Sequence, residues 1–472
     1  MRAFLIVFAT LTVVLCGCTS AAAPQAARPT NIVLFITDDF SWHDSEPYGA
    51  TDVRTPNMAK LAAEGMRFDR AIAASPTCTP SRSAMFTGLF PYRNGAHPNH
   101  SLIKEGLRTL PDYFHDLGYR VVLAGKTHIG PREQFAFEYV KGSNFMPKGK
   151  KGVLWTELDT GVVEKLLSEH DKAKPLCLIV ATHSPHVFWM DAQGYDAQKI
   201  KVPPYLLDTR ETRQMRAKYY TEVTHMDAQL GEVMGSMQRH GYADDAMLIF
   251  TADQGAQWPM AKWTLYDAGI RAPLIVRWPG KVKAGSTSGA LVSLIDLLPT
   301  MLEAASGKPP SDLDAKSFLS VLRGESQEHR EATFAVNTGD RNMNRSPMRA
   351  VRTAKYKYIL NLKPETVFKT HITDAGGEDG LFYWRSWETL AADGDAGAKA
   401  AIDRYRNRPA EELYDVEADP YELKNLAADP AHAAALGELR QKMKDWRLQQ
   451  GEDLSKVPMP EDARTGPLPY AE

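Results

Sequence analysis

A cysteine followed within one helical turn by a proline and an arginine is the part of this sequence best suited to chemistry. Cys78 precedes Pro80 by two residues and Arg82 by four. Proline suits the first turn of a helix, where its missing N–H group would be unpaired in any case. Residue 78 is therefore predicted at a helix N-terminus, where free N–H groups and the helix dipole favour an anion. Arg82 would add a cation suited to a tetrahedral oxyanion. The alternative is a buried structural cysteine before an ordinary helix, and the surrounding sequence argues against it.

Two pairs of oxygen-bearing side chains stand at the ends of apolar runs that are predicted to be buried strands. They are Asp38 and Asp39 after residues 31–37, and Asp253 and Gln254 after residues 246–251 and one alanine. In an open parallel sheet, ligands bind beyond the carboxyl ends of the strands, so both pairs are expected at one edge. Three carboxylates and an amide oxygen favour a hard cation, with Ca²⁺ the first choice and Mg²⁺ the second.

Lysines and histidines lie near further predicted strand ends. They are Lys126 and His128 after residues 120–124, His183 after residues 176–182, and Lys262 beyond the second acidic pair. An imidazole titrates near neutral pH and suits proton transfer. Each residue taken alone is equally compatible with an exposed loop, but its position at a strand end favours a functional role. His186 is interpreted as a structural or substrate-side neighbour.

Together these motifs resemble the signatures of type I, formylglycine-dependent sulfatases. The resemblance covers residues 31–450 and rests on four features: Cys-x-Pro-Ser-Arg at 78–82 with the run that ends at Thr87-Gly88, the two acidic pairs, Gly-Lys-Thr-His at 125–128, and the segment 265–273 after Lys262. Details at 125–131 and 382–387 look most like the heparan N-sulfatase (sulfamidase) branch.

The resemblance implies that a maturation enzyme converts Cys78 to formylglycine, whose hydrated aldehyde attacks sulfur. It implies a calcium ion bound by Asp38, Asp39, Asp253, Gln254 and residue 78. It assigns catalysis to Cys78, Arg82, His128, His183 and Asp253, and sulfate binding to Lys126 and Lys262. In these terms Asp253 accepts the proton of the nucleophile, His183 protonates the leaving atom, and His128 helps to release sulfate. Most relatives carry Asn or His where Gln254 stands; glutamine keeps the oxygen donor and adds a methylene.

Two other functions share part of the pattern. Phosphodiesterases and phosphonate hydrolases have the same architecture, and some use formylglycine, but they usually carry His at the position of Gln254. A catalytically inactive glycan-binding lipoprotein is disfavoured because every expected catalytic residue is present. The expected substrate is a sulfated carbohydrate, such as a glycosaminoglycan fragment, attacked at a chain end; N- and O-sulfate remain open. Several residues are candidates for contact with the sugar, although each taken alone is more often a surface or packing residue. They are His97, His100, Arg341, Arg345, Arg349, Trp384 and Trp387.

The elements that must position these residues alternate between strands and helices. Besides the runs already named, residues 273–277 read as a strand, and residues 55–65, 109–117 and 211–239 as helices. The pattern predicts an α/β sandwich of the alkaline-phosphatase and sulfatase type, with a central, mostly parallel sheet over residues 31–330. Residues 331–472 are predicted to form a smaller subdomain with an antiparallel sheet, two strands within 349–360 and a last helix at 431–449. Residues 391–400 are expected to be a loop.

The remaining features concern location. The chain has 472 residues, four cysteines and a net charge of −2, so nothing global indicates a nucleic-acid partner. Residues 1–18 read as a lipoprotein signal peptide with Cys18 as the lipidated residue, because the apolar run is too short to span a bilayer. Residues 19–30 read as a tether. The protein is expected to be exported and held by lipid at the outer membrane or in the periplasm, with simple secretion as the alternative. Cys177 is expected to be buried and unpaired.

Overall fold

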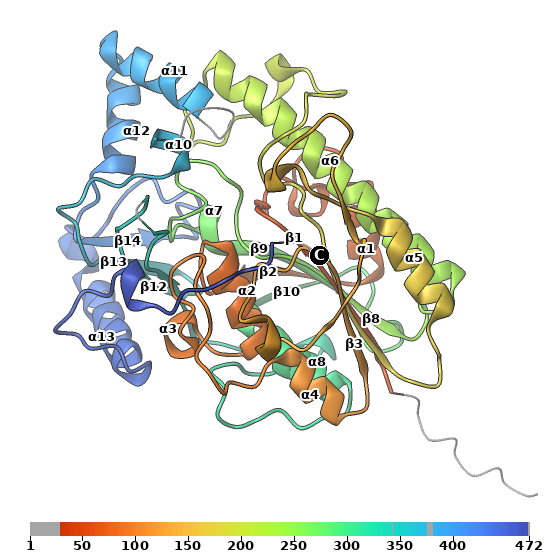
Figure 1. Ribbon diagram of the computed structural model, residues 1–472. Helices are drawn as coiled ribbons and strands as arrows, with labels where there is room; N and C mark the ends of the chain where they lie inside the picture. The colour runs from red at the N-terminus through yellow and green to blue at the C-terminus, as the bar shows by residue number, and fades with distance from the viewer. Residues whose placement is uncertain (1–28, 342, 375–380, 471–472) are drawn as a thin grey trace, which may run out of the picture.

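The structure is a computed structural model, and it describes residues 29–341, 343–374 and 381–470. Its centre is a sheet of eight strands with helices on both faces (Figure 1). In spatial order the strands are β10 (Ser286–Ser293), β2 (Met66–Ile72), β9 (Arg271–Arg277), β8 (Ala246–Ala252), β1 (Asn31–Thr37), β7 (Leu176–Ala181), β3 (Arg120–Gly125) and β4 (Glu138–Tyr139).

The middle of this sheet is parallel, and its strands are buried on both faces, as is usual for parallel strands. Strands β1, β7 and β8 consist almost entirely of Ile, Val, Leu, Phe and Ala, and each is buried along nearly its whole length. Val33 of β1 lies opposite Leu178 on one side and Leu248 on the other. Strand β9 runs antiparallel to both of its neighbours, whereas every other pairing in the sheet is parallel. The predicted, mostly parallel sheet is confirmed.

Helices cover both faces of the sheet. Figure 1 shows α1, α5 and α6 on one side and α2, α4 and α8 on the other. The helices of this part are α1 (Pro56–Glu64), α2 (Cys78–Thr87), α3 (Pro91–Asn94), α4 (Leu110–Asp116), α5 (Thr160–Glu169), α6 (Arg210–Arg239), α7 (Asp267–Ile270), α8 (Leu297–Ala304) and α9 (Leu319–Leu322). A short hairpin of β5 (Asn144–Phe145) and β6 (Glu157–Leu158) lies outside the main sheet. Among the described residues, no helix is both long enough and apolar enough to cross a membrane.

A second, smaller sheet forms late in the chain. Its antiparallel strands are β11 (Ala332–Asn337), β12 (Met348–Thr353), β13 (Tyr356–Asn361) and β14 (Glu411–Asp415). Helix α13 (Ala433–Gln449) packs on β12 and β13, while α10 (His371–Asp374), α11 (Leu381–Ala392) and α12 (Ala396–Arg406) form a separate group in which α11 contacts α6. Side chains of this sheet join the main hydrophobic core, so the two sheets are packed together.

The structure corrects one predicted element and adds two strands that were not predicted. Residues 391–400 are not a loop: α11 continues to Ala392, and α12 begins at Ala396 with the Asp395 carboxylate capping its N-terminus. Alanine is a strong helix former, and only residues 393–395 separate the two helices, with Gly394 at φ 98°. Strands β2 and β10 were not predicted because polar residues interrupt their apolar pattern. The predicted signal peptide and Cys18 lie outside the described residues.

Candidate active site

Cys78 stands where its motif predicts, at the first residue of α2. Thr77 before it is extended, and Pro80 occupies the first turn, where it lacks no hydrogen bond that the helix needs. Every residue of α2 is buried, and Cys78 is only 2% exposed. Ser81 ties the helix to the neighbouring strand end, because its hydroxyl donates to the Asp253 carbonyl oxygen at 2.6 Å. The helix therefore presents residue 78 to the carboxyl edge of the central sheet.

Three carboxylates meet Cys78 at that edge because β1 and β8 are parallel and in register. Thr37 pairs with Ala252, so the residues that follow each strand emerge together. The carboxylates of Asp38, Asp39 and Asp253 offer oxygens that all lie within 4.8 Å of one another. The Cys78 thiol lies 3.6 Å from Asp38 Oδ1 and 4.0 Å from Asp39 Oδ1.

Three buried cations face these carboxylates. Arg82 Nε lies 2.7 Å from Asp253 Oδ2, and Lys262 Nζ lies 2.5 Å from Asp39 Oδ2. Lys126 contacts Asp38 and also lies 3.9 Å from the Cys78 sulfur. Lys126 follows β3, and Lys262 belongs to the loop after β8, so the cations approach from opposite sides. The arrangement places positive charge around residue 78, where an anionic group would bind.

The pKa values follow from burial and crowding. Burial opposes the charge of Asp38, but Lys126, His186 and Arg82 hold its pKa well below the ordinary value. Burial and the nearby Asp38 outweigh Arg82 and raise the pKa of Asp253 to about 7. Burial raises the pKa of the Cys78 thiol to about 12. A thiol with such a pKa is protonated at neutral pH and is a poor nucleophile.

The donor set fits a hard divalent cation. Crowded carboxylates favour a bound cation, which would relieve their mutual repulsion. Gln254 donates from Nε2 to Asp39 Oδ1 at 2.6 Å, with the same nitrogen 3.1 Å from the Cys78 sulfur. Its Oε1 is buried and has no partner in the described structure. The two ends of an amide are nearly isosteric, so a half-turn would bring Oε1 to the carboxylates.

Two predicted imidazoles complete the chamber. His128 follows β3 at φ 53°, and His183 follows β7 and lies 2.7 Å from Asn144 Oδ1 through its Nε2. Burial, followed by the charge of Lys126, lowers the pKa of both histidines well below the ordinary value. The Nδ1 atoms of both rings are buried without a partner among the described residues. All of the sequence-predicted site residues are thus brought together at one sheet edge.

Three residues that the sequence analysis did not assign to the site also lie there. His186 Nε2 is 3.5 Å from Asp39 Oδ2, and Asn144 is the partner of His183. Tyr470, only two residues from the chain end, has its hydroxyl 3.2 Å from Lys126 Nζ. His186 was interpreted from the sequence as a structural or substrate-side neighbour, and its contact with Asp39 places it beside the carboxylates. Neither Asn144 nor Tyr470 has a motif around it, and only the folded chain brings them to the chamber.

The wider set of possible sugar contacts is largely structural. Trp384 and Trp387 are buried in the core, and Arg349 is buried in an ion pair with Glu452. His100 lies beside the chamber, because its ring centroid is 4.9 Å from that of His128, whereas Arg341 is exposed and Arg345 forms an ion pair with Glu461. A sugar ring could not stack on the two tryptophans without opening the core.

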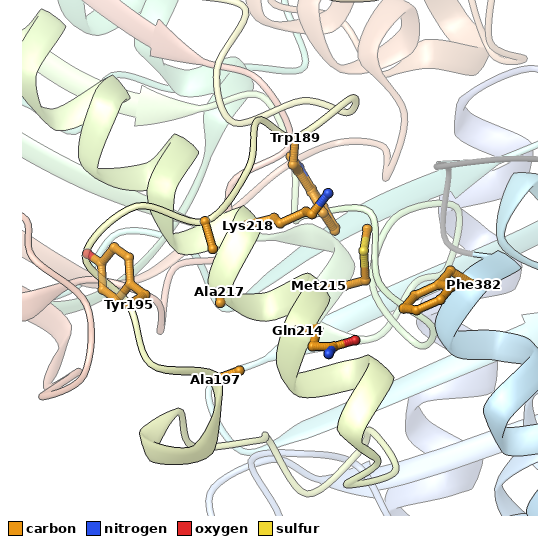
Figure 2. Close-up of a pocket in the computed structure, with 9 residues that line it drawn as sticks. Trp189, Tyr195, Ala197, Gln214, Met215, Ala217, Lys218 and Phe382 are labelled. Atoms are coloured by element: carbon orange, nitrogen blue, oxygen red, sulfur yellow. The ribbon is translucent and has the colours of Figure 1, made fainter.

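A separate cavity lies between α6 and the loop that follows β7 (Figure 2). Its volume is about 550 Å³, and its walls are mainly apolar, with Trp189 from the loop, Met215 from α6 and Phe382 from α11. Lys218 reaches across it in Figure 2. None of the carboxylates, cations or imidazoles described above lines this cavity. The chemistry therefore belongs to the sheet edge.

Comparisons with known proteins agree with this geometry. The sulfatase family model matches residues 30–308, and the model of the C-terminal region of N-sulphoglucosamine sulphohydrolase matches residues 257–371. An ulvan-active sulfatase of Formosa agariphila is 32% identical over 90% of this chain and 81% of its own length. Human N-sulphoglucosamine sulphohydrolase is 28% identical over 89% of this chain and 90% of its own.

Solved structures share the fold at lower identity. One, a complex with its substrate D-glucosamine-2-N,6-O-disulfate, has a TM-score of 0.67 at 22% identity and covers 90% of this chain and 98% of its own. A phosphonate monoester hydrolase from Silicibacter pomeroyi has a TM-score of 0.65 at 19% identity and covers 89% and 96%. The extent of the family match, together with a close relative along most of the chain, shows that this chain is a hydrolase of the sulfatase family.

Proposed function

We propose that the protein hydrolyses sulfate groups from a sulfated carbohydrate, with formylglycine at position 78 and a bound Ca²⁺. The observation that carries this proposal is the buried arrangement of three carboxylates and three cations around residue 78 at a helix N-terminus. Arg82, Lys126 and Lys262 would surround a tetrahedral anion, and their charges would stabilise the negative charge that develops in the transition state.

The residues of this chain fit both groups on which the proposed reaction depends, the calcium ion and formylglycine. Asp38, Asp39, Asp253, Gln254 and the oxygen of residue 78 would hold the calcium ion, with Mg²⁺ as the alternative. Bound there, the ion would supply electrostatic stabilisation at the nucleophile and the sulfate. Formylglycine, made by a maturation enzyme, would supply a nucleophilic oxygen and a second hydroxyl for releasing sulfate. The high pKa of the unmodified Cys78 thiol supports the need for this oxidation.

Side chains of the chamber would carry out the proton transfers. Asp253 lies beside residue 78 and would accept a proton from the nucleophile. His183, which follows β7 and lies beside Asn144, would protonate the leaving oxygen or nitrogen. A bound sulfate anion favours the protonated imidazole, which offsets the effect of burial on the pKa of His183. His128 would assist the release of sulfate.

Charge near the chamber supports a polyanionic substrate. Residues 141–156 contain four lysines and no Asp or Glu, although the whole chain has a net charge of −2. The segment is linked to the chamber through Asn144, the partner of His183. Within it, Lys150 lies 3.5 Å above the ring of Trp155, which packs against Phe188. An aromatic surface beside cations suits a sulfated sugar chain. The two relatives named for ulvan and for N-sulphoglucosamine support a glycan and leave N- and O-sulfate open.

Two further proposals concern organisation and location. Residues 31–330 would form the catalytic domain and residues 331–472 a C-terminal subdomain; β11 begins directly after this boundary. Residues 1–18 would be a lipoprotein signal peptide and 19–30 a tether, so the enzyme would work outside the cytoplasm on polymer fragments. A Cys18→Ser variant that still fractionates with membranes through its N-terminus would exclude the lipid anchor.

A substrate panel tests the proposed activity. Protein co-expressed with a formylglycine-generating enzyme would be offered N- and O-sulfated mono- and oligosaccharides, phosphodiesters and phosphonates, with free sulfate or phosphate as the readout. Peptide mass spectrometry at residue 78 would report the aldehyde. We expect sulfate release only from protein that carries the aldehyde. Faster cleavage of phosphodiesters or phosphonates than of every sulfated sugar would overturn the proposal, as would full activity with an intact thiol.

A further inference from the structure

The last described residues of the chain return to the catalytic chamber. Figure 1 shows the segment after α13 crossing from the small sheet to the carboxyl ends of the central strands. Backbone hydrogen bonds hold it there: Leu102 N donates to Arg464 O at 2.8 Å, His128 N to Pro469 O at 2.9 Å, and Thr127 N to Tyr470 O at 3.1 Å. The segment 464–470 is thus bound to the same loop that carries Lys126 and His128.

The side chain of Tyr470 lies among the groups that handle the sulfate and the leaving atom. Its ring centroid is 5.3 Å from that of His128, 5.4 Å from that of His183 and 6.3 Å from that of His186. Lys126 Nζ lies 3.2 Å from the Tyr470 hydroxyl and 4.4 Å from its ring centroid. An oxygen bonded to Lys126, beside His183, is the position that the leaving oxygen of a sulfate ester must occupy in the proposed reaction.

The chamber is closed while Tyr470 is there. Cys78 is 2% exposed, Lys262 3% and His183 4%. A sulfated sugar has to reach all three of these residues at once, and Tyr470 fills the space between Lys126 and the imidazoles. Solvent and substrate therefore need the segment to move.

From this geometry we propose that Tyr470 is a specificity-determining residue that competes with the substrate for Lys126. The segment 464–470 occupies the leaving-group side of the chamber, and a sulfated sugar binds by displacing it. Only a substrate whose sulfate and sugar together bind better than Tyr470 would enter efficiently. This proposal rests on the proposed function for the identity of the substrate, but the occupation of the chamber can be tested separately.

Displacement by the substrate has a defined kinetic consequence. When the competent state is a fraction of the free enzyme, the apparent dissociation constant rises by the inverse of that fraction. Tyr470→Ala should therefore lower KM for a sulfated sugar about tenfold or more and leave kcat within about twofold. Tyr470→Phe keeps the ring and loses the hydroxyl on Lys126, so its KM should lie between the two. Tyr113→Ala, a partly exposed tyrosine on α4, is the matched control and should change neither constant.

The test that does not depend on turnover uses the unmodified thiol. Full-length protein made without a maturation enzyme would be treated with iodoacetamide, and alkylation of Cys78 would be followed by peptide mass spectrometry. Cys177, fully buried in β7, is an internal control in the same molecule. We expect Cys78 to react at least about tenfold faster in Tyr470→Ala, and in a chain that ends at Gly466, than in the wild type, with Cys177 unchanged.

The outcomes separate this proposal from the proposed function. Equal alkylation rates of Cys78 in the wild type and Tyr470→Ala would overturn the occupation of the chamber, whatever the activity. A higher KM in Tyr470→Ala would show that Tyr470 assists binding of the substrate, which also overturns it. Faster alkylation in a protein that hydrolyses no sulfated sugar would support the occupation and reject the sulfatase activity. If truncation at Gly466 prevents folding, the full-length Tyr470→Ala chain still gives both readouts.

Discussion

Two buried carboxylates of this protein, Asp253 and Asp296, each face an arginine, yet their pKa values shift in opposite directions. Both are fully buried, Asp253 at the catalytic edge of the sheet and Asp296 before α8. Burial disfavours the charge of both. The pKa of Asp253 is raised to about 7, whereas that of Asp296 is lowered to about 2. Burial beside an arginine therefore does not by itself determine whether the pKa of a carboxyl rises or falls.

The difference comes from the remaining neighbours. Asp296 accepts hydrogen bonds from the backbone N–H groups of Ser293 and Lys316, from His329, and from Arg330 Nε at 2.6 Å. Asp253 also accepts hydrogen bonds from backbone N–H groups and Arg82, but its neighbours Asp38 and Asp39 both raise its pKa. A fully hydrogen-bonded carboxylate with cationic neighbours is a structural anchor. Crowded carboxylates at a strand end form a site that gains from a metal ion.

The largest effect is expected from neutralising the crowded carboxylate. Asp253→Asn should lower kcat/KM by about a thousandfold, because it removes the proton acceptor and the negative charge of a metal ligand together. Its thermal unfolding in calcium-free buffer should be unchanged or shifted upward, since one of three repelling charges is gone. Steady-state sulfate release and calorimetry measure the two effects. Loss of stability with wild-type turnover per folded molecule would contradict the comparison.

The anchor should show the opposite behaviour. Asp296→Asn leaves Arg330 buried without its charge partner, so the free energy of unfolding should fall by about 3 kcal/mol. Activity per folded molecule should stay within about twofold, because Asp296 does not contact the chamber. Urea denaturation gives the first quantity. Asp445→Asn, an exposed acid on α13, is the matched control and should change stability by no more than about 0.5 kcal/mol.

The fold was predictable where local pattern and tertiary environment agree. Strands β1, β7 and β8 are apolar along nearly their whole length, so their burial and the meeting of the two acidic pairs could be inferred from the sequence. Strands β2 and β10 carry charged or polar residues in their interiors, and only their pairing in the sheet, β2 with β9 and β10 with β2, makes them strands. Residues 391–400 were expected to be a loop because they are rich in Ala, Gly and Asp, although they contain the end of α11 and the start of α12.

The candidate site divides in the same way. Residues that follow predicted strands, such as Asp38, Lys126 and His183, could be placed because strand ends share an edge. Tyr470 and Asn144 reach the chamber through long-range contacts that leave no local signal. Gln254 was identified by position, but which of its amide atoms faces the carboxylates depends on what occupies the site.

The pH dependence of stability sharpens the contrast between the two carboxylates. A carboxyl whose pKa falls from about 3.9 in the unfolded chain to about 2 in the folded protein binds fewer protons when folded. Asp296 therefore adds stability above about pH 4, in all about 2.6 kcal/mol, and this stability is lost as the pH falls towards 2. The stability gap between the wild type and Asp296→Asn should narrow between about pH 6 and about pH 3. A gap that is constant over this range would show that hydrogen bonding, not charge, carries the contribution.

The smallest effect is expected from Gln254, whose amide is a neutral donor. Gln254→Asn keeps the amide but withdraws it by one methylene, so calcium affinity should fall about tenfold, equivalent to about 1.4 kcal/mol. A ligand that binds only the folded state stabilises it according to its concentration relative to its dissociation constant. A calcium titration of the unfolding temperature should therefore shift to about tenfold higher calcium, and kcat should recover when calcium is in excess. Gln193→Asn, in an exposed loop, is the control.

An unchanged calcium titration would mean that the amide oxygen of Gln254 does not bind the ion. The buried Oε1 has no partner among the described residues, so it would then need another one, and the substrate is the remaining candidate in the chamber. If Gln254→Asn lost more calcium affinity than Asp253→Asn, the expected order of the two effects would be reversed. Geometry rather than charge would then be the main determinant of metal binding.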